Sequence, residues 1–201
     1  MAPVLDPTDE RGEGNGPAGA APFLDSTQAS KPETDYSMTG SILQINISPG
    51  GIPKRPIPEA TVTAEGILGD RWAHPDIHGG PMQALLLITS EGIEELITQG
   101  YPLFHGALGE NLTIEGLDRL QMRIGQRYRV GEVFLELTKL RAPCTTLDVY
   151  GPAIKQAMYD AQMKAGDPLT PRWGLSGFYA RVLKAGTIRP QDIIALVDQV
   201  V

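Results

Sequence analysis

The sequence predicts a mainly β protein with a few short α-helices, and three observations support that fold class. Many short segments rich in β-branched and aromatic residues follow one another, separated by glycine and proline. Helical periodicity is confined to two short segments. The regular alternation of strands and helices that builds a doubly wound sheet is absent. We therefore expect a β-barrel or a β-sandwich.

Length and composition favour one domain in the cytoplasm. The chain has 201 residues, 41% of them hydrophobic, and a net charge of −7, which suits a single sizeable core. The acidic balance argues against binding to nucleic acid or to an anionic membrane. No apolar run approaches the roughly 20 residues that cross a bilayer. The N-terminus lacks the pattern of a secretory signal, and a lone cysteine fits the cytoplasm.

Residues 1–39 differ in composition from the rest of the chain. Glycine, proline, alanine, small hydroxyl residues and acids dominate them, and large apolar side chains are sparse. Such a segment cannot bury enough apolar surface to offset the entropy lost on ordering. We expect a disordered or loosely docked tail over residues 1–39 and a domain over residues 40–201.

The first half of the predicted domain contains three strands and one helix. Alternating or continuous apolar residues predict strands at residues 41–48, 61–64 and 82–89. Ser90 is the expected N-cap of a helix over residues 91–99, where apolar residues share one face and Gly100 can end the helix.

The second half contains a hairpin, a helix and further strands. Residues 127–130 and 133–139 flank Gly131-Glu132 and predict a β-hairpin. A helix is expected to begin at Pro152 and to end at Gly166. Residues 106–114 form a glycine-marked loop that is expected to run into a strand, and the last strands are predicted at residues 176–183, 187–188 and 193–197.

Cys144 is the most reactive side chain that the sequence offers. It follows the strand predicted at residues 133–139, and Pro143 stiffens the approach to it. Lys139 and Arg141 bring positive charge nearby, which lowers the pKa of a thiol and suits an anionic ligand. A lone thiol of this kind is a nucleophile, a sulfur carrier or a metal ligand. The alternative is a free cysteine packed as a small hydrophobic residue.

The polar loop over residues 69–81 is a second candidate region. Its glycines Gly79 and Gly80 can bring backbone N–H groups close to an oxyanion or a phosphate. Pro75 argues against a helix, so the spacing of the two histidines does not by itself indicate a metal site, and surface histidines are the alternative. The side chains in question are Asp70, His74, Asp76 and His78.

Five short motifs follow one another in an order that is more specific than any one of them. They are Gly69-Asp70-Arg71, His78-Gly79-Gly80-Pro81, Gly109-Glu110-Asn111-Leu112-Thr113, Ile124-Gly125 and Arg141-x-Pro143-Cys144. Together they resemble the MOSC domain, the C-terminal module of molybdenum-cofactor sulfurases, in its stand-alone bacterial YiiM-type form. The resemblance runs from about residue 41 to about residue 192. It implies a MOSC-type β-barrel with a few short helices and a pocket for the molybdenum cofactor (molybdopterin).

The resemblance also implies roles for individual residues. Cys144 matches the key cysteine of the family, as the catalytic residue and the molybdenum ligand. Arginine and lysine side chains would hold the phosphate and the pterin. Acidic and amide side chains would hold pterin N–H groups or position the arginines, with structural hydrogen bonding as the alternative for Glu110. The implied cofactor-binding set is Asp70, Arg71, His78, Gly79, Gly80, Glu110, Asn111, Lys139 and Arg141.

The implied activity is the reduction of N-hydroxylated compounds by an oxidoreductase. The chain departs from the pattern at Met82-Gln83-Ala84, where relatives carry an aspartate and a basic residue before the alanine. It also lacks the ferredoxin-like C-terminal domain of some MOSC reductases, so we expect an external electron-transfer protein as partner. One alternative is a non-catalytic carrier that uses Cys144 as a persulfide site. Another is a metal hydrolase or oxygenase that uses His74, Asp76 and His78.

Overall fold

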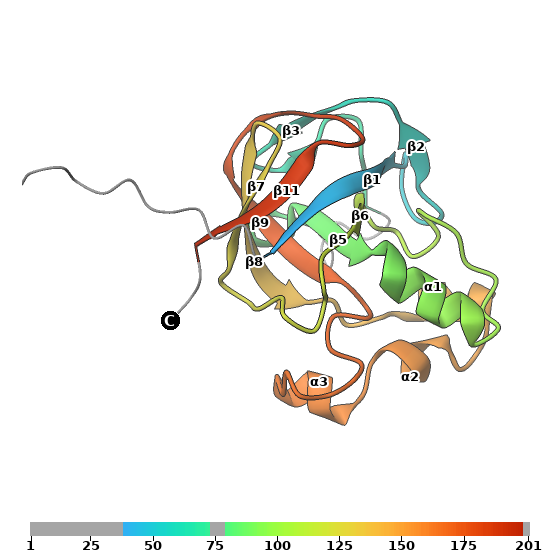
Figure 1. Cartoon of the computed structure of the whole chain (residues 1–201). Helices are drawn as coiled ribbons and strands as arrows, with labels where there is room; N and C mark the ends of the chain where they lie inside the picture. Colours follow the sequence, from blue (N-terminus) through green and yellow to red (C-terminus); the bar gives the residue numbers. More distant parts are fainter. Residues whose placement is uncertain (1–37, 73–78, 199–201) are drawn as a thin grey trace, which may run out of the picture. The chain divides into compact units, whose positions relative to one another are not determined.

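Seven strands close into a β-barrel in the computed structural model, which describes residues 38–72 and 79–198. The strands are β1 (Thr39–Ile47), β5 (Leu85–Thr89), β6 (Leu112–Glu115), β7 (Arg127–Val130), β8 (Val133–Leu140), β9 (Phe178–Lys184) and β11 (Ile193–Asp198). Their order around the barrel is β11-β7-β8-β9-β5-β6-β1, and β1 pairs back to β11 (Figure 1). The predicted fold class, a mainly β barrel with a few short helices, is confirmed.

Strand β1 is long and forms hydrogen-bonded pairs with three other strands. Its first residues pair with β11, its middle pairs with β6, and its last three pair with β2 (Arg55–Ile57). The register against β6 shifts between Ile42 and Gln44, which marks a β-bulge where the strand bends. A separate small sheet is formed by β10 (Gly186–Ile188), β3 (Ala60–Thr63) and β4 (Gly66–Ile67).

Strand β5 separates two hydrophobic cores. Leu85 and Leu87 belong to the core that fills the barrel, whereas Leu86 and Ile88 belong to a second core. Since side chains alternate along a strand, both faces of β5 are covered. This explains its continuous apolar sequence, which is typical of a strand buried on both faces.

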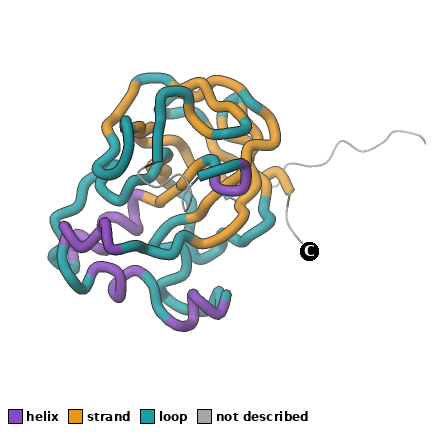
Figure 2. The backbone as a smooth tube through the Cα atoms, turned by 180° about the vertical axis from the view of Figure 1, so that it is seen from behind, coloured by secondary structure: helices purple, strands orange, loops and turns teal. Residues whose placement is uncertain are grey.

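The structure has three α-helices and two 3-10 segments in its described part. They are α1 (Ser90–Thr98), α2 (Ile154–Met158) and α3 (Ala161–Ala165), with η1 (Pro81–Gln83) and η2 (Thr145–Tyr150). Helices α1 and α2 contribute buried side chains to the second core. In Figure 1, α2 and α3 lie below the barrel and α1 lies at its lower right, and Figure 2 shows the same layer from behind. No helix in the described part of the chain has the length and apolarity needed to cross a bilayer.

Several predicted element boundaries were wrong, each for a local reason. The strand expected from residue 82 begins at Leu85 because η1 precedes it. Thr89 rather than Ser90 caps α1, since its hydroxyl accepts a hydrogen bond from the Gly92 N–H at 3.2 Å. The helix expected from Pro152 to Gly166 is interrupted at Tyr159, whose backbone is extended. The hairpin expected around Gly131-Glu132 is confirmed as β7 and β8.

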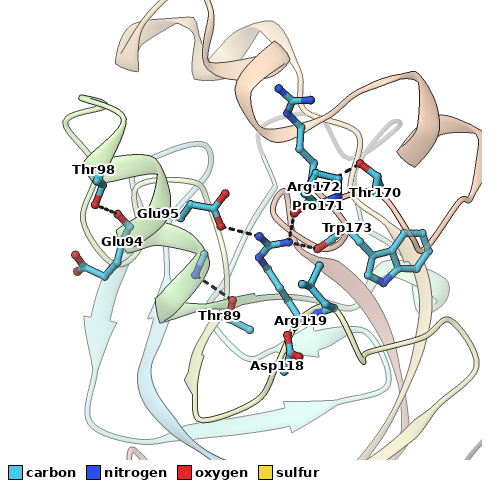
Figure 3. A network of polar contacts seen from close by, with 12 residues as sticks. Thr89, Glu94, Glu95, Thr98, Asp118, Arg119, Thr170, Pro171, Arg172 and Trp173 are labelled. Atoms are coloured by element: carbon cyan, nitrogen blue, oxygen red, sulfur yellow. Dashed lines mark hydrogen bonds and ion pairs between the residues drawn. The ribbon is translucent and has the colours of Figure 1, made fainter.

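Arg119 connects the helical layer to the segment that leads into β9 (Figure 3). Its Nη1 donates to the carbonyl oxygens of Pro171 at 2.9 Å and Trp173 at 2.5 Å, while its Nη2 pairs with Glu95 of α1 at 2.6 Å. Trp173 in turn donates from Nε1 to the carbonyl of Met122 at 2.7 Å. These bonds fix the start of β9, and β9 contributes Tyr179 to the site described below.

Some predictions fall on residues outside the described ranges. The predicted tail lies outside them except for Met38 and Thr39, so the domain boundary stays a prediction. His74, Asp76 and His78 also lie outside them. Within residues 38–72 and 79–198, no cluster of three or more histidine, cysteine or acidic side chains could hold a metal ion.

Candidate functional site

A pocket with a volume of about 80 Å³ brings Cys144 together with side chains from six parts of the chain. The connection between β1 and β2 contributes Lys54, and the segment after β4 contributes Arg71 and Trp72. Leu86 of β5 and Tyr179 of β9 belong to the second core, so the pocket opens beside the outer face of the barrel. The other lining residues that matter here are Gln83, Leu108, Gly109, Asn111, Arg141 and Thr146.

Cys144 stands at the N-terminal end of η2 and is half-buried. Its Sγ donates to Thr146 Oγ1 at 3.3 Å. Burial by itself raises the pKa of Cys144, but the hydrogen bonds at Thr146 and the charge of Arg141 outweigh burial and lower the pKa below its ordinary value. The thiolate is the form that attacks electrophiles and binds metals, so the pocket favours the reactive form.

We expect Thr146→Val to raise the pKa of Cys144, because the substitution removes a hydroxyl that can donate to the thiolate. The rate of alkylation by iodoacetamide, measured across a pH series, should then reach its half-maximum at higher pH than in the wild type. Thr145→Val is the matched control, since Thr145 is exposed. Equal midpoints for the Thr146 variant and the wild type would contradict the role of this hydroxyl.

Arg141 is a buried cation in the lining of the pocket. The residue is 5% exposed, and its Nη2 donates to the carbonyl of Leu108 at 3.1 Å. Its backbone is fixed on both sides, by an N–H bond to Gly177 at 2.9 Å and by the Ser176 hydroxyl at 2.6 Å. Its Nη1 is buried and has no hydrogen-bond partner among the described residues. A ligand acceptor would therefore satisfy a costly unpaired donor.

Asp70, a predicted cofactor-binding residue, does not line the pocket, but it forms a buried ion pair with Lys54, which does. Their side chains are only 4% and 6% exposed, respectively. Asp70 also accepts hydrogen bonds from the Ser48 N–H and from Asn111 Nδ2, both at 2.8 Å. Burial lowers the pKa of Lys54, although the charge of Asp70 acts to raise it. Asn111 Oδ1 accepts from the Leu86 N–H at 3.1 Å, so this network connects β1, β5 and the start of β6.

Glu110 is fully buried but does not line the pocket. Its Oε1 accepts from the Gly106 N–H and, at 3.1 Å, from the Thr113 hydroxyl. Burial raises the pKa of Glu110, while these hydrogen bonds act in the opposite direction. Its other oxygen has no partner among the described residues. Glu110 thus braces the turn that presents Gly109 and Asn111.

Three further predicted site residues lie outside the pocket lining. Lys139 is exposed, and its ammonium lies 5.4 Å from the centre of the Tyr179 ring. Gly79 packs on the indole of Trp72 so closely that a Cβ atom there would lie 2.5 Å from two ring carbons. Gly80 precedes η1 with a positive φ of 83°. Gly79 therefore supports the pocket indirectly, through the position of Trp72.

The pocket also contains residues that the sequence did not indicate. Lys54 and Trp72 carried no signal, because neither belongs to a recognisable motif. Tyr179 is an aromatic residue next to Phe178, a pattern that core packing explains equally well. Thr146 lies two residues after Cys144, and this closeness in the chain was the only indication in the sequence that Thr146 could belong to the site.

Comparisons with known proteins identify a family and related proteins. The sequence matches the model of the MOSC domain family over residues 74–195. It is 33% identical to the uncharacterized protein YflK of Bacillus subtilis over 153 residues, covering 74% of this chain and 64% of YflK. It is 30% identical to a protein named "Reductase" from Gibberella moniliformis, covering 68% of this chain and 23% of that protein. The chain thus spans less than two thirds of the length of either relative.

A solved structure extends the comparison to the fold. The structure resembles the crystal structure of YiiM from Geobacillus stearothermophilus with a TM-score of 0.59 and 27% sequence identity. The match covers 79% of this chain and 75% of that protein.

Proposed function

The chain belongs to the MOSC domain family, and on that premise we propose that it is a molybdenum-dependent oxidoreductase that reduces N-hydroxylated compounds. MOSC domains are associated with the molybdenum cofactor, and one relative carries the name "Reductase". The observation that carries the proposal is the pairing of two groups in one pocket. A half-buried thiol of lowered pKa lines the same pocket as a buried guanidinium, one of whose donors has no partner among the residues that the structure describes.

The residues of the pocket fit the molybdenum cofactor chemically. A thiolate is a soft ligand of the kind that molybdenum accepts, and Cys144 supplies it. Arg71 is exposed at the pocket and Arg141 is buried in it, and guanidinium groups bind phosphate and pterin oxygens. The pocket volume of about 80 Å³ is smaller than the roughly 300–1,000 Å³ of ligand pockets in general. The pocket would therefore hold only part of the cofactor, with the metal at Cys144.

The reaction consumes two electrons and two protons: R–NHOH + 2 e⁻ + 2 H⁺ gives R–NH2 + H2O. When bound, the cofactor would supply the two-electron chemistry that breaks the N–O bond. Cys144 would bind the metal as a thiolate, and Thr146 and Arg141 would favour that form because they lower the pKa of the thiol. The positive charge of Arg141 would hold the cofactor. The Lys54–Asp70 ion pair would keep Asn111 in place in the pocket lining, because Asn111 donates a hydrogen bond to Asp70. An external protein would supply the electrons.

The test is turnover with a chemical reductant. The full chain is purified from a host that makes the molybdenum cofactor and is then supplied with dithionite and an N-hydroxylated purine. We expect formation of the amine, with one equivalent of product for each two electrons consumed. A protein that contains the cofactor but forms no amine would contradict the reductase proposal.

The second candidate function is a carrier of sulfur or of the cofactor. The lowered pKa of Cys144 favours it equally, because a thiolate also forms persulfides. A carrier would bind its cargo tightly and would transfer it to another protein without reducing an N-hydroxylated compound. The turnover experiment therefore distinguishes the two candidates.

A further inference from the structure

A second groove, with a volume of about 510 Å³, is lined by residues of β8, of α3 and of the segments beside them. We call it the basic groove and define it by Arg123, Lys139 and Lys164, with Ile124, Tyr159 and Met163 between them. The two sites are joined by one side-chain contact. The Lys139 ammonium lies over the ring of Tyr179, and Tyr179 lines the Cys144 pocket.

The three cations of the basic groove are not neutralised. Within the described ranges none of them forms an ion pair, and no acidic side chain lines the groove. The Arg123 guanidinium donates to the backbone carbonyls of Leu120 at 2.6 Å and Met122 at 2.9 Å and lies 5.7 Å from the centre of the Trp173 ring, so its contacts in the described ranges include no carboxylate. Of the two acids that flank α3, Asp160 pairs with Arg172. The other, Asp167, lies in the chain between the lining residues Gly166 and Pro168, so the three cations of the groove outnumber the one carboxylate beside it. The groove therefore has the opposite sign to the chain as a whole, whose net charge is −7.

Apolar side chains are exposed in the groove and beside it. Ile124, which lines the groove, is 37% exposed, and Leu169, which follows the lining residue Pro168 in the chain, is 87% exposed. Exposed apolar side chains rimmed by polar and charged residues mark interaction sites. Transient electron-transfer complexes have small interfaces of this kind, which form quickly because complementary charges steer the partners together.

We propose that the basic groove is the docking surface of an acidic electron-donor protein, which delivers electrons to the Cys144 pocket past Lys139 and Tyr179. This inference rests on the proposed reductase function. Charge complementarity selects an acidic partner, and the contact between Lys139 and Tyr179 brings that partner next to the redox site. The donor is oxidised by two electrons for each N–O bond that is reduced, and the two protons come from water.

The test compares two charge reversals that are equal in size. Lys164→Glu changes the basic groove, whereas Lys184→Glu changes an exposed lysine on β9 that does not line it. Each variant is assayed twice, once with reduced flavodoxin, an acidic donor, and once with dithionite. We expect Lys164→Glu to lower the flavodoxin-driven kcat/KM about tenfold at low ionic strength and to lose this defect in high salt. Rates with dithionite should match the wild type.

The possible outcomes separate this inference from the proposed function. No reduction with dithionite in the wild type would overturn the reductase function itself. Reduction with dithionite, but equal flavodoxin-driven rates for Lys164→Glu and Lys184→Glu, would overturn only the docking surface. The docking surface would also be overturned if the dithionite-active wild type took no electrons from reduced flavodoxin or from an acidic ferredoxin.

Discussion

Cys144→Ser is expected to lower dithionite-driven turnover of an N-hydroxylated substrate by at least about 100-fold. Changes to residues that only orient the ligands of a metal site cost about 10–100-fold, and the loss of the ligand itself should cost at least as much. A serine hydroxyl is a harder and much weaker acid than a thiol, so it does not replace a soft thiolate at neutral pH. The measurement is kcat with substrate in excess.

The matched control for this variant is Thr145→Ala. Thr145 is the next residue in the chain, and its side chain is exposed and absent from the pocket lining. This variant should keep the wild-type rate. A Cys144→Ser protein that folds normally and reduces the substrate at a rate close to the wild type would remove Cys144 from the proposed mechanism.

Asp70→Leu should lower the free energy of unfolding by about 3–5 kcal/mol, because removal of one partner leaves the buried Lys54 ammonium uncompensated. Both side chains are almost fully buried. The substitution also leaves the Ser48 N–H and Asn111 Nδ2 without their acceptor. The measurement is the midpoint of urea denaturation, which should fall while the slope of the unfolding free energy against urea concentration stays unchanged.

Two further variants test the cause of this loss. The double variant Lys54→Met/Asp70→Leu should recover a large part of the stability, because no buried charge is then left unpaired. Glu59→Ala breaks an ion pair with Arg189 whose two side chains are more than half exposed, and should cost only about 0–1 kcal/mol. If Asp70→Leu were no more destabilising than Glu59→Ala, the buried ion pair would not be a stabilising feature of the pocket wall.

Periodicity and turn chemistry were sufficient to predict the fold class. The apolar run of β5 and the hairpin of β7 and β8 are local signals, because each depends on residues close together in the chain. The position of Cys144 just after β8 followed from the same reasoning. Closure of the barrel was not local, since it depends on the pairing of β1 with β11 across most of the domain.

The composition of the pocket was predictable only where a motif pointed to it. Asn111 and Arg141, two of the predicted cofactor-binding residues, line the pocket, whereas Glu110, the chain neighbour of Asn111, belongs to a buried hydrogen-bond network. Lys139 lies outside the pocket lining, on a stretch of β8 where the register against β9 shifts between Leu137 and Lys139. Lys54 is far from the cysteine in sequence, and only the folded β1 to β2 connection brings it to the pocket. Such irregularities and long-range contacts leave no periodic signal.

The central claim is that Cys144 binds molybdenum, and elemental analysis tests it most directly. Wild type, Cys144→Ala and the control Thr145→Ala are purified from a host that makes the molybdenum cofactor, and their metal content is measured. We predict about one molybdenum per chain in the wild type and in the control, and loss of the metal in Cys144→Ala, because metal affinity depends on the full set of ligands. A wild type without molybdenum, or a Cys144→Ala protein that retains it, would contradict the claim.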